Sequence, residues 1–182
     1  MIQQNPANNF TTFWMKRYPE TPPINYFFKL RMPERWARVH SLPLSKRYAD
    51  TAEEWDILLE RQNAVMDYLI AQGTPVRVVI NYIREDSPLF ASYDMENIGV
   101  FIDRDAETVF QSFWFETNWN TGCLDSMLRM IAVEEVRAFI VGSDCLMVPY
   151  DGGADVILKD ETTRNSFKNH FTEWLSVHPR GL

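Results

Sequence analysis

The sequence predicts a single α+β domain over residues 1–182, with three main helices packed mostly on one face of a mixed or antiparallel sheet of about five strands. Three observations support this fold class. Segments with helical and strand-like hydrophobic patterns alternate in the order helix, strands, helix, strands, helix. The late strands are separated by tight turns, which favours antiparallel pairing. The length of 182 residues and the hydrophobic content of 46% suit one core.

The longest predicted helix runs from about Ala52 to Ala71. Its start is marked by Thr51 and Glu54, which have the spacing of a capping box. Apolar side chains then recur along it at helical spacing, which predicts one buried stripe. Gly73 favours the left-handed conformation that follows many helices, so we expect the helix to end just before it.

The strand predictions rest on runs of β-branched and aromatic residues between turn signals. Residues 108–117 have aromatic side chains on both faces of the predicted strand. Either both faces of the strand are covered by other parts of the chain, or one face is an exposed apolar patch that binds a ligand or partner. A short helix is expected before residue 137, and a last helix over about 161–177 with Asp160 as its N-cap. The expected strands are 76–83, 108–117, 137–142, 145–150 and 154–158, with 97–103 as a further candidate.

Residues 1–33 are predicted to form an irregular, aromatic N-terminal arm. Five prolines in this segment, from Pro6 to Pro33, interrupt any long helix. Its seven aromatic side chains favour burial, so we expect the arm to pack against the body of the domain.

The acidic composition bears on the class of partner. The chain has 18 Lys and Arg residues against 25 Asp and Glu residues, a formal net charge of −7. An acidic surface repels phosphate backbones, which argues against nucleic-acid binding and suits a basic protein partner, although solubility alone also explains such a charge. No segment is apolar for the length of a membrane span, and residues 1–14 lack the pattern of a secretory signal. We therefore expect a cytoplasmic protein that does not bind a membrane.

A basic segment, Lys29–Tyr48, contrasts with this acidic chain. It contains six basic residues and one acid, a formal charge of +5, so the rest of the chain carries −12. Arg38, Lys46 and Arg47 are candidates to hold an anion such as a phosphate or a carboxylate. The alternative is that these cations pair with the acids of the following helix, at residues 50–56.

Two residues are candidates for acid–base chemistry. His40 lies among arginines, which should lower the pKa of its ring and leave it neutral and able to act as a base; the alternative is a structural histidine at a turn. Asp151 precedes a glycine turn, where it can act as a base or simply form the corner of a tight hairpin. No catalytic motif, metal-ligand spacing or cofactor-binding loop is recognisable, so we expect no metal and no cofactor.

Two motifs resemble those of a sparsely characterised group of small bacterial cytosolic proteins. They are HSLPLSKRYADT at residues 40–51 and VPYDGGADVIL at residues 148–158, and the ending WLSVHPRGL at residues 174–182 adds to the resemblance. This chain departs from that group at Gln62, where the group has His, which argues against metal or acid–base chemistry on that helix. In size, acidity and architecture the chain is also similar to bacterial immunity proteins, which neutralise a toxin by covering its active site.

The first function hypothesis is a non-enzymatic protein-binding domain, such as an immunity protein or antitoxin that inhibits a basic toxin domain. An acidic surface would steer such a partner toward the chain and speed their encounter. Exposed carboxylates around an aromatic centre would form the contact, with Tyr93, Trp114 and Trp119 as candidates.

The alternative hypothesis is a small enzyme or sensor that binds an anionic, nucleotide-like ligand through residues 38–48. In this interpretation His40 or Asp151 would act as the base. It requires that residues 38–48 and the turn at 150–155 face one pocket, which is a test that a structure can make.

Overall fold

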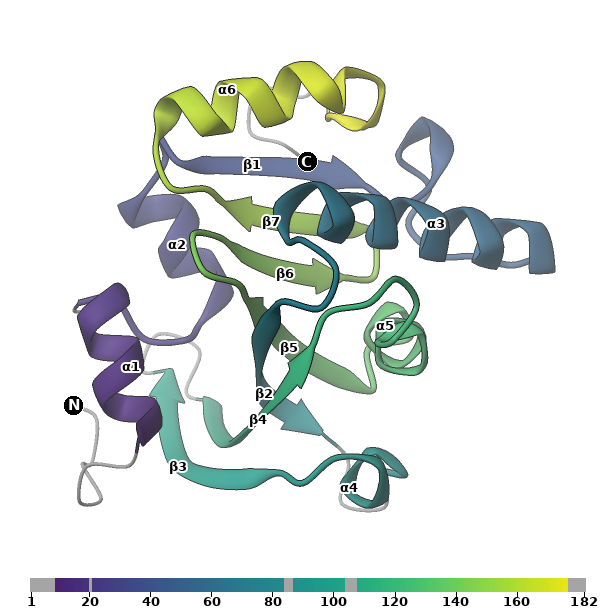
Figure 1. Ribbon diagram of the computed structural model, residues 1–182. Helices are drawn as coiled ribbons and strands as arrows, with labels where there is room; N and C mark the ends of the chain where they lie inside the picture. The colour runs from purple at the N-terminus through teal and green to yellow at the C-terminus, as the bar shows by residue number, and fades with distance from the viewer. Residues whose placement is uncertain (1–8, 20, 84–86, 104–107, 177–182) are drawn as a thin grey trace.

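The computed structural model describes residues 9–19, 21–83, 87–103 and 108–176, which contain one antiparallel sheet of seven strands (Figure 1). The strands lie in the order β1-β7-β6-β5-β2-β4-β3. The α+β class and the antiparallel pairing were predicted, but the sheet is larger than the five strands expected. The strands are β1 (Trp36–His40), β2 (Pro75–Ile83), β3 (Glu96–Asp103), β4 (Thr108–Asn118), β5 (Val136–Val141), β6 (Leu146–Tyr150) and β7 (Gly153–Ile157).

β1 is the strand that the sequence analysis missed, because it lies inside the basic segment and charged residues interrupt its apolar pattern. Its side chains nevertheless alternate, since Ala37 and Val39 are buried in the larger core while Arg38 points to the other face. β1 pairs antiparallel with β7, with Arg38 directly opposite Asp155. This pairing brings the basic segment next to the glycine turn that precedes β7.

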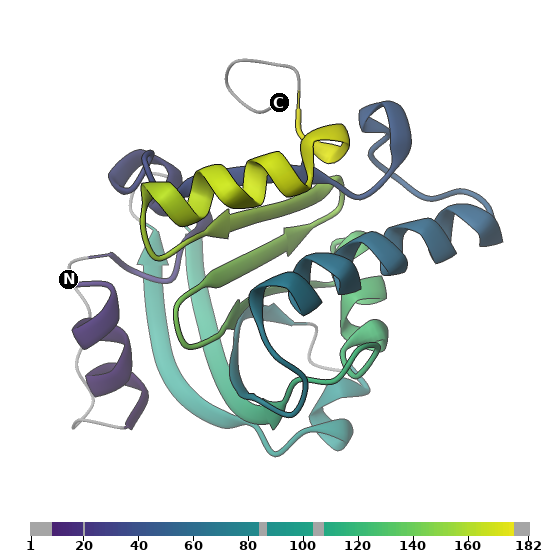
Figure 2. The same cartoon turned by 45° about the horizontal axis from the view of Figure 1, so that its top comes forward.

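Three main helices cover one face of the sheet, as predicted (Figures 1 and 2). The start of the first has the predicted N-cap, because the Thr51 hydroxyl accepts a hydrogen bond from the backbone N–H of Glu54 (3.3 Å). The Glu54 carboxylate accepts from the backbone N–H of Asp50 (2.7 Å) and so extends the cap by one residue. The helices are α3 (Ala52–Leu69), α5 (Asp125–Ala132) and α6 (Glu161–His170), with a short α4 (Leu89–Ser92) near the β3 edge.

α6 is shorter than the predicted last helix. Asp160 caps its start as predicted, since its Oδ1 accepts a backbone N–H of the first turn (2.8 Å). The helix ends at His170, and a 3-10 turn, η2 (Thr172–Trp174), follows. The Thr172 hydroxyl donates to a carbonyl of the last helical turn (3.1 Å), which satisfies that group without a further turn of helix. The predicted end of this helix at residue 177, and residues 177–182 of the quoted ending, lie outside the described residues.

The N-terminal arm is not irregular, because it contains the helices α1 (Asn9–Arg17) and α2 (Asn25–Arg31). The prediction was wrong because the described prolines of the arm lie between and after these helices, where they interrupt no helical hydrogen bond. The arm packs against the sheet face opposite α3, as expected (Figure 2). Trp14 and Phe28 of the arm contact Phe139 of β5, with ring centroids 6.2 and 5.9 Å away, so the aromatic residues build a second core.

Candidate functional site

The pairing of β1 with β7 brings together the two segments that the sequence singled out. Arg38 and Asp155 form a bidentate ion pair across the two strands, with Nε–Oδ1 and Nη2–Oδ2 distances of 2.7 and 2.8 Å. The Asp155 side chain is 4% exposed and that of Arg38 is 17% exposed. A carboxylate this deeply buried needs such a partner, so this pair has a structural role.

The other two predicted anion-binding cations are also paired within the chain. Arg47 forms an ion pair with Asp151, whose side chain is buried at the corner of the glycine turn. Lys46 pairs with Asp50 (2.9 Å) and Glu54 (2.6 Å), as the alternative interpretation of the basic segment predicted. Each cation therefore already has a carboxylate, which reduces its attraction for an external anion.

His40 is buried beside these ion pairs, in what we call the β1–β7 corner: the two arginine–aspartate pairs with His40 and Gln62. Burial lowers the pKa of His40, and the charges of Arg38 and Arg61 lower it further, while a hydrogen bond with the backbone of Gly152 opposes them. The ring is thus neutral at pH 7, and its Nε2 has no hydrogen-bond partner among the described residues.

Gln62 of α3 connects the helix through hydrogen bonds to β7 and to the residue that follows β1. Its Nε2 donates to the Ser41 hydroxyl (2.6 Å) and to the Gly153 carbonyl (3.0 Å), while its Oε1 has no partner among the described residues. The two predicted segments are therefore neighbours, which is one part of what the enzyme hypothesis requires; the other part, a shared pocket, stays a prediction. However, Arg38 and Arg47 of the first segment form ion pairs with Asp155 and Asp151 of the second.

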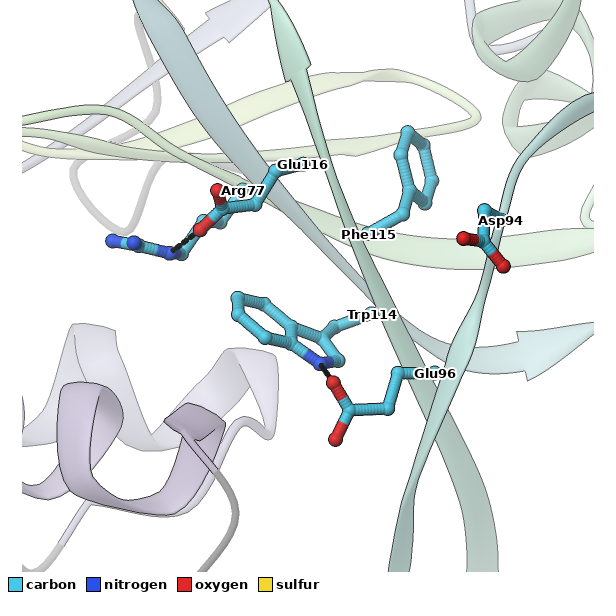
Figure 3. Close-up of a pocket in the computed structure, with 6 residues that line it drawn as sticks. All are labelled: Arg77, Asp94, Glu96, Trp114, Phe115 and Glu116. Atoms are coloured by element: carbon cyan, nitrogen blue, oxygen red, sulfur yellow. Dashed lines mark hydrogen bonds and ion pairs between the residues drawn. The ribbon is translucent and has the colours of Figure 1, made fainter.

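A different arrangement lies toward the other edge of the sheet, where a cavity of about 760 Å³ opens beside β4 (Figure 3). β4 contributes one acid and two aromatic side chains, Trp114 and Phe115, which point to opposite faces of the sheet. β2 contributes an arginine, and the start of β3 with the loop before it contributes two further acids. We call this cavity the acidic pocket, and it is lined by Asp94, Glu96, Glu116, Arg77, Trp114 and Phe115.

The register of the strands sets the contacts inside the acidic pocket. Arg77 lies opposite Glu116 across β2 and β4 and forms an ion pair with it. Glu96 lies opposite Trp114 across β3 and β4 and accepts a hydrogen bond from the indole Nε1 (2.8 Å). No ion pair between described residues includes Asp94. The lining carries a formal charge of −2, because it contains three acids and one cation, and that cation is paired with one of the acids.

The three predicted partner-binding aromatic residues are placed differently. Trp114 is 7% exposed but lines the acidic pocket. Tyr93 is half-buried and stacks on Phe115 of the pocket wall, with ring centroids 4.1 Å apart. Trp119 is fully buried and donates its indole N–H to Asp67 (2.9 Å), so it presents no contact surface and that part of the prediction was wrong.

The acids of the pocket were missed by sequence reasoning. They are spread along the chain and resemble ordinary solubilising residues when taken one at a time. The signal that unites them is the strand register, which places Glu116 opposite Arg77 and Glu96 opposite Trp114. That register depends on which strands pair, and the sequence alone does not reveal the pairing.

Two kinds of site are absent from the part of the chain that the structure describes. No group of three or more His, Cys, Asp and Glu side chains there is placed to hold a metal ion. No helix in that part combines the length and the apolar character needed to cross a membrane.

Comparison with known proteins identifies one family. A family model described as a domain of unknown function (DUF3885) matches residues 24–179, which is most of the chain and includes both the β1–β7 corner and the acidic pocket. No curated protein and no solved structure matches the chain.

Proposed function

The chain belongs to the DUF3885 family, and we propose that it is a non-enzymatic protein-binding domain whose partner carries a basic surface. In its most specific form, the proposal is that the chain is an immunity protein or antitoxin, which inhibits a bacterial toxin by covering the toxin's active site. The observation that carries the proposal is the acidic pocket, in which exposed carboxylates lie beside two aromatic side chains.

The chemistry of the acidic pocket suits a lysine or arginine side chain from a partner. Asp94 and the second oxygens of Glu96 and Glu116 are acceptors for charge-assisted hydrogen bonds. In the same cavity the guanidinium of Arg77 already lies over the Trp114 ring, 5.7 Å from its centroid, so this wall of the pocket accommodates a cation. The cavity of about 760 Å³ is much larger than a single ion and has room for more than one side chain of a partner.

The rest of the chain supports the same class of partner. The formal charge of −7 attracts a basic protein from a distance and raises the rate of encounter. An inhibitor of this type also needs no catalytic groups, since it acts by occupying a surface. The paired cations of the β1–β7 corner agree with this, because they stabilise the fold and leave the acidic residues to set the surface charge.

The test is a comparison of captured partners. Tagged wild-type protein and the variant Asp94→Asn/Glu96→Gln are used to capture proteins from native lysate at moderate salt, with quantitative mass spectrometry. The variant keeps the hydrogen bond from Trp114, because glutamine retains an acceptor oxygen. We expect a basic protein at near-equal stoichiometry with the wild type and at least about tenfold less with the variant, since charged contacts contribute well over 1.4 kcal/mol.

A charge-matched control separates the pocket from the overall charge. The variant Asp56→Asn/Glu60→Gln removes two exposed acids of α3 and should retain the partner. The proposal is wrong if the pocket variant retains the same protein as well as the wild type does, or if no basic protein is enriched. With the purified pair, the association rate should fall as ionic strength rises.

A second candidate is a small enzyme or sensor that binds an anionic ligand at the β1–β7 corner. Two observations favour it: the two predicted segments meet, and the Nε2 of the buried His40 has no partner among the described residues. Thermal-shift screening with nucleotides tests it, using Arg47→Ala to remove the most exposed cation of the corner. A shift that is lost in this variant supports the second candidate, and the absence of any shift removes it.

A further inference from the structure

A second charged cavity, of about 430 Å³, lies where the end of α1 meets one end of the sheet. Arg35 precedes β1, Lys159 follows β7, and the two strands are tied at this end by a hydrogen bond from Leu158 N–H to the Arg35 carbonyl (2.9 Å). The last turn of α1 and the turn between β5 and β6 complete it, at the end of the sheet nearest α1 in Figure 1. We call it the basic pocket, lined by Lys16, Arg17, Arg35, Lys159, Phe13, Ser143 and Asp144.

The basic pocket has an excess of positive charge that the chain does not neutralise. It contains four cations and one carboxylate, a formal charge of +3 in a chain of −7. None of the ion pairs between described residues includes any of the four cations. The nearby Asp160 feels the charges of Lys159 and Arg35, but its carboxylate caps α6, and counting it still leaves +2. This is the reverse of the β1–β7 corner, where each cation has its own carboxylate.

The two guanidinium groups are held through part of their donors only. Arg35 donates from Nε to the Leu158 carbonyl (2.6 Å) and from Nη1 to the Met32 sulfur (3.6 Å). Arg17 donates from Nε to the Tyr18 hydroxyl (3.2 Å). Within the described residues, Nη2 of Arg35 and both Nη groups of Arg17 make no hydrogen bond. An arginine fixed at one edge and unsatisfied at the other is pre-organised to bind an anion, because little side-chain entropy is lost on binding.

We propose that the basic pocket binds a small phosphate-bearing anion. Clustered arginine and lysine donors match the several oxygens of a phosphate better than the two of a carboxylate. The volume lies within the range of small-molecule sites and is too small for a macromolecule. Phe13 and Asp144 add an apolar wall and an acceptor, which fit the organic part of a nucleotide, while a free phosphate would use the cations alone.

This proposal does not depend on a protein partner, and it differs from the predicted anion site in residues 38–48. That site lies at the opposite end of β1, and its three candidate cations are paired. The two ideas therefore make different predictions for the same ligand, which allows one experiment to separate them.

The experiment is isothermal titration calorimetry with ATP and with inorganic pyrophosphate as probes. Arg35→Gln is a poor test, because the residue also holds the Leu158 carbonyl and its loss can disturb folding. The variant Lys16→Gln/Lys159→Gln removes two exposed cations of the pocket and should weaken binding at least about tenfold. The variant Lys46→Gln/Arg47→Gln removes the same charge at and beside the β1–β7 corner and should leave the affinity unchanged.

The outcomes separate the sources of the ligand as well. ATP bound more tightly than pyrophosphate identifies a nucleotide site, and equal affinities identify a site for phosphate alone. The proposal is overturned if neither probe binds, if the lysine variant binds as the wild type does, or if the corner variant loses binding equally. Because the partner capture uses other residues, either proposal can fail while the other stands.

Discussion

Two arginine–carboxylate pairs in this chain have the same construction and opposite surroundings. Arg38 faces Asp155 across β1 and β7, and Arg77 faces Glu116 across β2 and β4. In the first pair the two side chains are 17% and 4% exposed, and in the second they are 36% and 48% exposed. The first closes the β1–β7 corner, whereas the second lines an open acidic pocket.

The difference shows that burial, and not residue type, decides what such a pair does. A buried carboxylate without its arginine would be an uncompensated charge in a poorly solvated site, so the first pair is tied to the stability of the fold. An exposed pair is solvated whether or not it forms, so its charges stay available to a partner. The predictions below test this contrast, beginning with the largest expected effect.

Substitution of a glycine should distinguish the two regions most strongly. At Gly153 of β7 an added Cβ would overlap the carbonyl oxygen of Val39 in β1 and lie 3.1 Å from the Cα of His40. Backbone atoms cannot rotate away, so the two strands would have to separate. We expect Gly153→Ala to lower the free energy of unfolding by about 4 kcal/mol or more, measured by urea denaturation.

The matched variant is Gly99→Ala in β3, near the acidic pocket. An added Cβ there meets no atom within 4 Å, but the φ angle of +102° is unfavourable for alanine. We expect a loss of only about 1–2 kcal/mol from this conformational strain. Equal losses for the two variants would show that β1 and β7 are no more closely packed than the opposite edge.

The second prediction compares the two arginines directly. Arg38→Met should lower the free energy of unfolding by about 3–5 kcal/mol, because it leaves Asp155 buried without a partner. Arg77→Met should cost less than about 1 kcal/mol, because Glu116 remains solvated. Urea denaturation of both variants measures the difference.

A double variant separates the charge from the packing. Arg38→Met/Asp155→Leu removes both charges of the buried pair and should recover most of the stability lost in Arg38→Met. If the double variant is no more stable than the single one, the arginine stabilises the corner by packing and not by charge.

Features that depend on residues close together in the sequence were predicted, and features that depend on contacts between distant residues were not. Local signals gave α3 with its Thr51 cap, α6 with its Asp160 cap, and most strands, because caps, periodicity and turns are encoded within a few residues. β1 was missed because charged residues interrupt its apolar pattern, and only its pairing with the distant β7 makes it a strand. The acidic pocket was missed because Glu96 and Glu116 become neighbours of Trp114 and Arg77 only through strand register.

The smallest predicted effect concerns His40 and pH. Its folded-state pKa lies below the ordinary value of 6.5, so below that pH the unfolded chain binds a proton that the folded chain does not. The free energy of unfolding should therefore fall as the pH drops through about 6.5, and fall less steeply in His40→Gln. Urea denaturation between neutral and mildly acidic pH measures this, with His170→Gln as a surface control. Identical slopes for wild type and His40→Gln would contradict the inference.

The pairing of β1 with β7 has a consequence for how the chain is made. Arg38 and Asp155 are 117 residues apart, and at a synthesis rate of about 5–20 residues per second the carboxylate follows its arginine by about 6–23 seconds. During that interval the nascent basic segment lacks its two buried aspartates, and one edge of the sheet has no partner. The pairing of β1 with β7 therefore joins a strand synthesised early to one synthesised late.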